Sequence, residues 1–118
     1  MKLPLLPPLK PLRFIKSSHD DIKQFPPEPR RVAGEQLLLV QAGKMPEDWK
    51  PMTTVGPGAI EIRIRQPDEY RVIYVAKFPE AVYVLHSFLK KTNKTQDREI
   101  DKARKAYAET LRQRKRQG

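Results

Sequence analysis

The chain has 118 residues, no cysteine and a formal net charge of +10. This length suffices for one modest hydrophobic core, and a second folded domain is not expected. The lack of cysteine excludes disulfides, thiolate nucleophiles and cysteine-ligated zinc, and no apolar run approaches the roughly 20 residues that span a bilayer. We therefore expect a cytoplasmic protein.

The first part of the chain is rich in proline, which interrupts regular structure. Residues 1–9 are predicted to be a disordered leader, and residues 10–118 a single folded domain. Within this domain, residues 10–15 suit a short edge strand and residues 17–25 a short helix with acidic residues in its first turn. A second helix is predicted from the prolines at 27–29 to a stop at Gly43.

The middle of the chain changes from helical to strand periodicity. Residues 44–58 are predicted to form a long loop in which Trp49 is a core anchor. Alternating and β-branched segments then predict a meander of three antiparallel strands, at residues 60–65, 70–77 and 81–89.

The last element is predicted to be a helix with Thr95 as its N-cap. Its apolar positions share one face that should pack on the sheet: Ile100, Ala103, Tyr107 and Leu111. The expected fold is therefore α+β, with two N-terminal helices and a C-terminal helix packed on a small antiparallel β-sheet.

Basic residues concentrate in the last quarter of the chain. Residues 90–118 hold eleven Lys or Arg against four Asp or Glu, a net of +7. This charge predicts a polyanionic partner, and RNA, DNA, an anionic membrane surface and an acidic protein face all fit. Because the two histidines are far apart and cysteine is absent, we expect neither a metal nor another cofactor.

The first strand of the meander carries charge on one face. Its period of 2 places Glu61, Arg63 and Arg65 together, as in many solvated sheet faces. The next strand holds Arg71 among apolar residues, where a guanidinium needs a carboxylate or a ligand. Pairing with Glu61 is the simple structural interpretation of Arg71, and it does not exclude contact with RNA.

The third strand contains a histidine. His86 is expected to share a face with Val82, Val84 and Phe88. A histidine on such a face is either a core residue or, because imidazole titrates near neutrality, a group that exchanges protons with a substrate.

A basic loop, Lys-Lys-Thr-Asn-Lys-Thr at residues 90–95, joins the third strand to the last helix. Lys90, Lys91 and Lys94 lie there beside two hydroxyls and a helix N-terminus, a combination that suits a phosphate group. An ordinary solvated loop can have the same composition.

Five segments, read together, carry a resemblance to a known family. They are KPLRFI (10–15), DWKPM (48–52), EIRIR (61–65), YRVIY (70–74) and LHSFLKKTNKT (85–95). They resemble the phage-derived branch of the RelE/HigB toxin superfamily, and the resemblance covers nearly everything after Leu9. It implies a RelE-like fold and the toxin half of a type II toxin–antitoxin pair.

The resemblance further implies a metal-independent endoribonuclease that cuts messenger RNA, usually on the ribosome. A neighbouring antitoxin, often a HigA-like helix-turn-helix protein, would silence it. In this chemistry a ribose 2′-OH attacks the adjacent phosphorus, and the transition state concentrates negative charge.

The family's working residues can be carried over by position. Arg71 and Lys91 match the groups that stabilise the transition state, and His86 is the candidate proton carrier. The family's helical tyrosine aligns near Asp97, and Tyr107 lies too far along the helix and is expected in the core. The remaining matches are RNA-binding candidates: Arg63, Arg65, Lys90 and Lys94.

Two other functions fit the composition. A non-enzymatic basic RNA- or ribosome-binding protein, or a toxin homologue that has lost cleavage, would spread Arg71, His86 and Lys91 over a surface instead of gathering them in one cleft. A structural DNA-binding protein would bind through its last helix and would not depend on Arg71. For the toxin, Arg71→Ala should nearly abolish killing.

Overall fold

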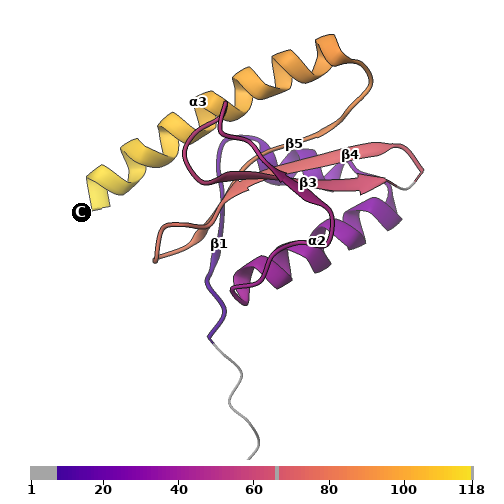
Figure 1. Cartoon of the computed structure of the whole chain (residues 1–118). Helices are drawn as coiled ribbons and strands as arrows, with labels where there is room; N and C mark the ends of the chain where they lie inside the picture. Colours follow the sequence, from indigo (N-terminus) through magenta and orange to yellow (C-terminus); the bar gives the residue numbers. More distant parts are fainter. Residues whose placement is uncertain (1–7, 66, 118) are drawn as a thin grey trace, which may run out of the picture.

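The structure is a computed structural model that describes residues 8–65 and 67–117, with the backbone alone for residues 93–95 (Figure 1). Most of the expected leader, residues 1–9, lies outside the described residues. The helices and strands are β1 (Leu12–Phe14), α1 (Ser18–Lys23), α2 (Pro27–Gln41), β2 (Trp49–Pro51), β3 (Ala59–Arg65), β4 (Glu69–Val75), β5 (Val82–Leu89) and α3 (Asn93–Gln117). The α+β class is confirmed, with two helices before the meander and one after it.

The sheet has five strands in the order β1-β5-β4-β3-β2. The meander β3-β4-β5 is antiparallel as predicted, but β1 pairs with β5 in parallel, so the small antiparallel sheet becomes a mixed one. The residue pattern of a three-residue edge strand carries no information on the direction of its partner. The prediction of a purely antiparallel sheet was wrong for this reason.

Strand β2 is a second difference from the sequence prediction. It lies within the segment predicted as a loop and adds three residues to the edge of the sheet beside β3. Trp49, predicted as a core anchor, lies on this edge strand and is 40% exposed. The strand was not predicted because the prolines and glycines around it usually indicate a loop.

Helices cover both faces of the sheet (Figure 1). Helix α2 lies on one face over a cluster that includes Ile62 and Val72, and α3 lies on the other over a cluster that includes Ile73 and Leu85. Strand β4 is therefore buried on both sides, which explains its nearly continuous apolar sequence. Among the described residues, no helix is long and apolar enough to cross a membrane.

Helix α2 begins and ends as its sequence predicts. Pro27 stands in the first turn, where the missing N–H costs nothing. Gly43 follows the helix with a φ of 84°, a conformation that glycine adopts without strain. The predicted stop at Gly43 is confirmed.

Helix α3 differs from the prediction in where it begins and in which residue of its C-terminal half is buried. It begins at Asn93, so Thr95 lies inside the helix and is not its N-cap. Ala103 and Tyr107 pack on the sheet as expected, but Leu111 is 45% exposed. Thr110 is buried in its place, because the 3.6-residue period brings position 110 toward the sheet. The Tyr107 hydroxyl donates to the Pro57 carbonyl at 2.6 Å, which places this tyrosine in the core as predicted.

Candidate functional site

Arg71 is buried on β4 between two carboxylates. Its Nε lies 3.5 Å from Glu61 Oε1 and its Nη2 lies 2.7 Å from Glu69 Oε2. The side chains of Arg71 and Glu61 are 4% and 0% exposed. The predicted pairing of Arg71 with Glu61 is confirmed, whereas Glu61 is buried and does not lie on the solvated sheet face that its strand pattern suggested.

Glu69 is the more exposed partner of Arg71. The Arg71 guanidinium holds the pKa of Glu69 below its usual range, and Arg65 and Lys90 lower this pKa further. Glu69 is therefore ionised at neutral pH. Together with Glu61 it fixes the Arg71 side chain by charge–charge attraction from two sides.

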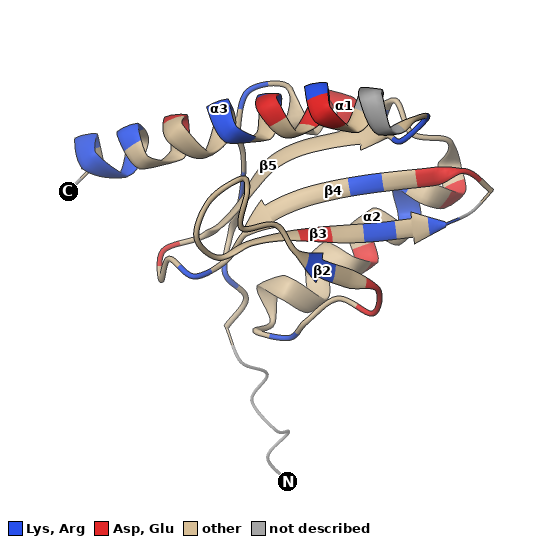
Figure 2. Ribbon diagram, turned by 45° about the horizontal axis from the view of Figure 1, so that its top comes forward, with Lys and Arg blue, Asp and Glu red and all other residues tan. Residues whose placement is uncertain are grey.

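Basic residues lie close together where β3 and β4 run side by side (Figure 2). Arg63 lies opposite Arg71 in the strand register, and its Nε is also 3.5 Å from Glu61 Oε1. One buried carboxylate thus lies beside two guanidinium groups. This shared carboxylate holds the two like-charged guanidinium groups next to each other.

A hollow of about 410 Å³ opens over these groups. We call it the cationic hollow, and its lining is Arg63, Arg65, Glu69, Arg71, Lys90, Lys91 and Thr92. Five of these residues are cations and one is a carboxylate. A hollow with this balance attracts anions such as phosphate.

The predicted RNA-binding residues are brought together in the cationic hollow, apart from Lys94. Arg65 is half exposed and its Nε is 3.1 Å from Asp48 Oδ2. Lys90 is held by its backbone, whose N–H donates to the Glu69 carbonyl at 2.7 Å. Lys94 belongs to α3, but its side chain lies outside the described residues.

A β-bulge changes the position of His86. Ile73 pairs with His86 whereas the next residue, Tyr74, pairs with Val84, so Leu85 is the extra residue of β5. Val84 packs on the α2 side of the sheet, and His86 faces the α3 side. The prediction that His86 shares a face with Val82 and Val84 was therefore wrong.

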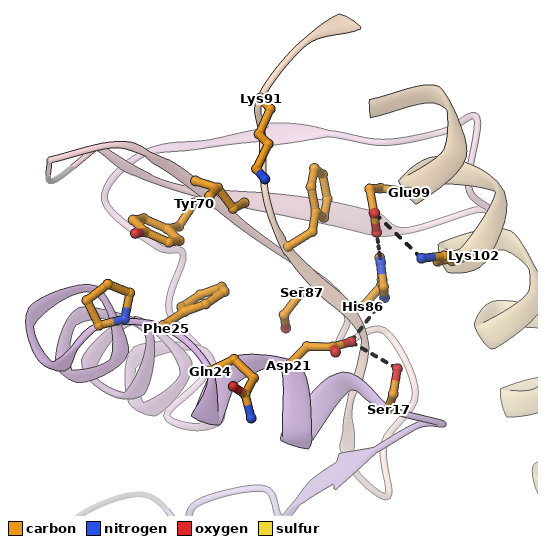
Figure 3. A pocket seen from close by; sticks show the side chains of 13 residues that line it. Ser17, Asp21, Gln24, Phe25, Tyr70, His86, Ser87, Lys91, Glu99 and Lys102 are labelled. Atoms are coloured by element: carbon orange, nitrogen blue, oxygen red, sulfur yellow. Dashed lines mark hydrogen bonds and ion pairs between the residues drawn. The ribbon is translucent and has the colours of Figure 1, made fainter. Parts of the chain in front are cut away.

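His86 lies between two helices that each supply a carboxylate (Figure 3). Its Nε2 is hydrogen-bonded to Glu99 of α3, and its Nδ1 is 3.7 Å from Asp21 Oδ2 of α1. The Ser17 hydroxyl donates to Asp21 at 2.9 Å, and Lys102 Nζ lies 3.6 Å from Glu99 Oε1. His86 is thus part of a polar cluster that links α1, β5 and α3.

A second hollow, of about 470 Å³, lies next to this cluster (Figure 3). We call it the aromatic hollow, after the rings of Phe25, Tyr70 and Phe88 in its wall. Its lining is Ser17, Asp21, Gln24, Phe25, Pro26, Tyr70, His86, Ser87, Phe88, Leu89, Lys91, Glu99 and Lys102. Lys91 lines both hollows, so they are neighbours that meet at this exposed side chain.

The three predicted catalytic residues are thus divided between two hollows. Arg71 lines the cationic hollow, His86 lines the aromatic hollow and Lys91 lines both. Sequence reasoning missed Asp21 and Glu99, the carboxylates around His86. His86 faces them because of the bulge in β5, for which the alternating pattern gave no signal.

Within the described part of the chain, no group of three or more His, Asp or Glu side chains is placed to hold a metal ion. The cationic hollow offers guanidinium and ammonium groups, and the aromatic hollow offers imidazole, carboxylate, amide and hydroxyl groups.

Fold and site together define a small basic α+β protein with an anion-attracting hollow at one end of its sheet. Residues 20–108 match the family described as phage derived protein Gp49-like (DUF891). The chain belongs to this family, which is a toxin-like family of the RelE/HigB type and suggests a cognate antitoxin as partner. No curated protein and no solved structure matches the chain.

Proposed function

We propose that the protein is the toxin of a type II toxin–antitoxin pair and acts as a metal-independent endoribonuclease on messenger RNA in the cytoplasm. The observation that carries the proposal is the buried Arg71, fixed by Glu61 and Glu69, in a hollow lined by four other cations. A rigid guanidinium in such a hollow is suited to a phosphate that gains charge during reaction.

The proposed reaction is attack of a ribose 2′-OH on the adjacent phosphorus. The phosphate lies in the cationic hollow, where Arg71 and Lys91 stabilise the negative charge of the transition state. Arg63, Arg65 and Lys90 hold the flanking phosphates. A single well-placed donor of this kind contributes about 10²–10³ in rate.

His86 is the proposed proton carrier. It lies across Lys91 from the cationic hollow, and Glu99 orients its ring through Nε2. This arrangement resembles a general acid or base positioned by a carboxylate. His86→Gln, which keeps a polar side chain of similar size, should reduce cleavage without reducing RNA affinity.

The proposed partners follow from this reaction. Messenger RNA, bound on the ribosome, is the substrate, and a HigA-like helix-turn-helix antitoxin is the inhibitor. An antitoxin that covers the cationic hollow would need acidic groups, because five cations line it.

The test is induced expression of wild-type protein, Lys91→Ala and Arg71→Lys, with and without the adjacent gene, while cuts in translated messages are mapped. Wild type should arrest growth and cut messages, and the adjacent gene should relieve both effects. Lys91→Ala should cut messages about 10²–10³-fold more slowly, because one donor to the transition state is lost. Lys91 is exposed, so this substitution should leave the fold intact. Arg71→Lys keeps the charge but loses the bidentate geometry and should also fail.

Lys44→Ala is the matched control. Lys44 is exposed, follows α2 and is not part of the cationic hollow. This variant should be as toxic as wild type. If expression of the wild-type protein does not arrest growth, the assignment as a toxin is wrong. If growth stops but messages stay intact, the assignment as a ribonuclease is wrong.

A second candidate is an RNA-binding protein without cleavage. It is favoured by one observation: both ring nitrogens of His86 face carboxylates of the protein itself, and the side chain is 7% exposed. In that case His86→Gln would change stability alone, and the cationic hollow would still bind RNA.

A further inference from the structure

Ser87 has a buried hydroxyl with no hydrogen-bond partner among the described residues. The residue is 2% exposed and lines the aromatic hollow. Buried polar groups in folded proteins nearly always have a partner, and an unpaired one costs stability. An unpaired hydroxyl at the wall of a hollow is therefore a candidate contact for a ligand.

The wall around Ser87 suits a flat ring. Phe25 and Tyr70 pack with their ring centroids 4.8 Å apart, and Phe88 stacks on His86 with centroids 5.7 Å apart. Each of these residues is less than 9% exposed. Aromatic walls of this kind bind planar ligands by stacking.

Neutral polar groups complete the hollow. Gln24, which is exposed on the α1 side, carries an amide that can both donate and accept, and the Ser87 hydroxyl can do the same (Figure 3). The volume of about 470 Å³ lies within the range of about 300–1,000 Å³ that is typical of small-molecule sites. Ring-shaped polar ligands therefore fit both its size and its chemistry.

The charges of the two hollows differ. Asp21 and Glu99 balance Lys91 and Lys102 in the aromatic hollow, whereas five cations face one carboxylate in the cationic hollow. A phosphate is attracted to the cationic hollow, and an uncharged polar ring is better matched by the aromatic one. Because Lys91 lines both hollows, a single ligand that carries a phosphate and an uncharged polar ring can occupy the two hollows at once.

We propose that the aromatic hollow binds one unpaired nucleobase of an RNA strand whose phosphates occupy the cationic hollow. The base stacks on the aromatic wall, and Ser87 and Gln24 form hydrogen bonds with its edge. Lys91 holds the phosphate between the two sites. This inference rests on the proposed function for its choice of RNA, and it adds a base-binding site to the cleavage site.

The test is binding of short single-stranded RNA by the full chain and by Ser87→Ala. The probes are fluorescein-labelled 2′-fluoro RNA hexamers, which lack the attacking hydroxyl, intact or with one abasic position. Fluorescence anisotropy gives the affinity. Wild type should lose at least about fivefold in affinity when one particular base is removed, because stacking of that base is lost.

Ser87→Ala should bind the intact hexamers about three- to tenfold more weakly than wild type, because one hydrogen bond is lost. The two proteins should bind the abasic hexamer equally, since the contact is then absent from both. The Tm of free Ser87→Ala should equal or exceed that of wild type, because the substitution removes an unpaired hydroxyl.

Ser18→Ala is the matched control. Ser18 is also buried, but its hydroxyl donates to the Val84 carbonyl at 2.9 Å. This variant should have a lower Tm and unchanged RNA affinity. Equal binding of intact RNA by Ser87→Ala and wild type, or no binding of any hexamer by wild type, would overturn the inference. If binding depends on the base but messages are not cleaved in cells, the proposed enzymatic activity is wrong and the base-binding site still stands.

Discussion

The Arg71 guanidinium and the Glu61 carboxylate form an ion pair, with Nε 3.5 Å from Oε1, at a depth where neither side chain is more than 4% exposed. Two consequences follow. Arg71 is held in place before any ligand arrives, and its removal leaves a buried carboxylate whose remaining cationic neighbour in the described part of the chain is Arg63, also at 3.5 Å.

Arg71→Ala should therefore lower the free energy of unfolding by about 3–5 kcal/mol, the usual cost of breaking a buried ion pair from one side. The double variant Arg71→Met with Glu61→Leu should regain most of this loss, because both fully buried charges are removed and the partners left behind, Arg63 and Glu69, reach solvent. Urea titration measures both. If the single variant is as stable as wild type, the pair does not contribute to the stability of the fold.

The loss of toxicity expected for Arg71→Ala has this structural cause as well as a catalytic one. For this reason Arg71→Lys is the better functional test.

The cationic hollow predicts salt-dependent RNA binding. Each phosphate contact adds roughly 0.7 to the slope of log affinity against log salt for single-stranded RNA. Lys90→Ala should weaken binding at low salt and reduce this slope by about that amount, whatever the base sequence. Lys44→Ala should leave the slope unchanged. A slope that is equal in wild type and Lys90→Ala would show that Lys90 does not contact phosphate.

The hydrogen bonds of Glu80 lead us to predict that the protein loses stability in acid. It accepts hydrogen bonds from Arg114 Nε and from the Tyr83 hydroxyl, each at 2.6 Å, and these lower its pKa from 4.5 to about 2. A lowered carboxyl pKa stabilises the fold fully above pH 4.5, and this contribution is lost as the pH falls toward 2.

Glu80→Gln should thus have a lower Tm than wild type at pH 7, and the difference should shrink between pH 4.5 and 2. Thermal unfolding followed by circular dichroism at several pH values measures it. Asp68→Asn, in an exposed turn, is the control. A difference that stays constant with pH would contradict the assignment.

Tyr107 is predicted to be structural and not catalytic. Tyr107→Phe removes the hydrogen bond to Pro57 and should lower the free energy of unfolding by about 0.5–1.5 kcal/mol without loss of toxicity. Gly56→Ala would place a methyl group 2.6 Å from the Tyr107 ring and should cost about 1–3 kcal/mol. Loss of message cleavage in Tyr107→Phe with an unchanged Tm would show instead that this hydroxyl takes part in the reaction.

Much of this architecture is readable from local patterns. The period of 2 predicted β3, β4 and β5 to within a few residues, and the prolines with Gly43 bounded α2. The Arg71–Glu61 pair was predictable because a guanidinium inside an apolar strand needs a counter-charge and the neighbouring strand held one.

The features that escaped prediction depend on contacts between distant segments. The direction of β1 is set by its partner β5, and β2 is too short and too rich in loop residues to show a pattern. The bulge at Leu85 reversed the expected face of His86 and with it the identity of its neighbours, Asp21 and Glu99. A shift of one residue in a strand moves a side chain to the other face, so a single irregularity was enough.

The parallel pairing of β1 with β5 also bears on how the chain folds. Leu12 pairs with Val82, a partner 70 residues later in the sequence. During synthesis the N-terminal strand must therefore wait until the rest of the sheet has left the ribosome. Because Glu99 on α3 completes the surroundings of His86, the site is assembled only after α3 has emerged from the ribosome, and a nascent chain that stops before Glu99 would lack it.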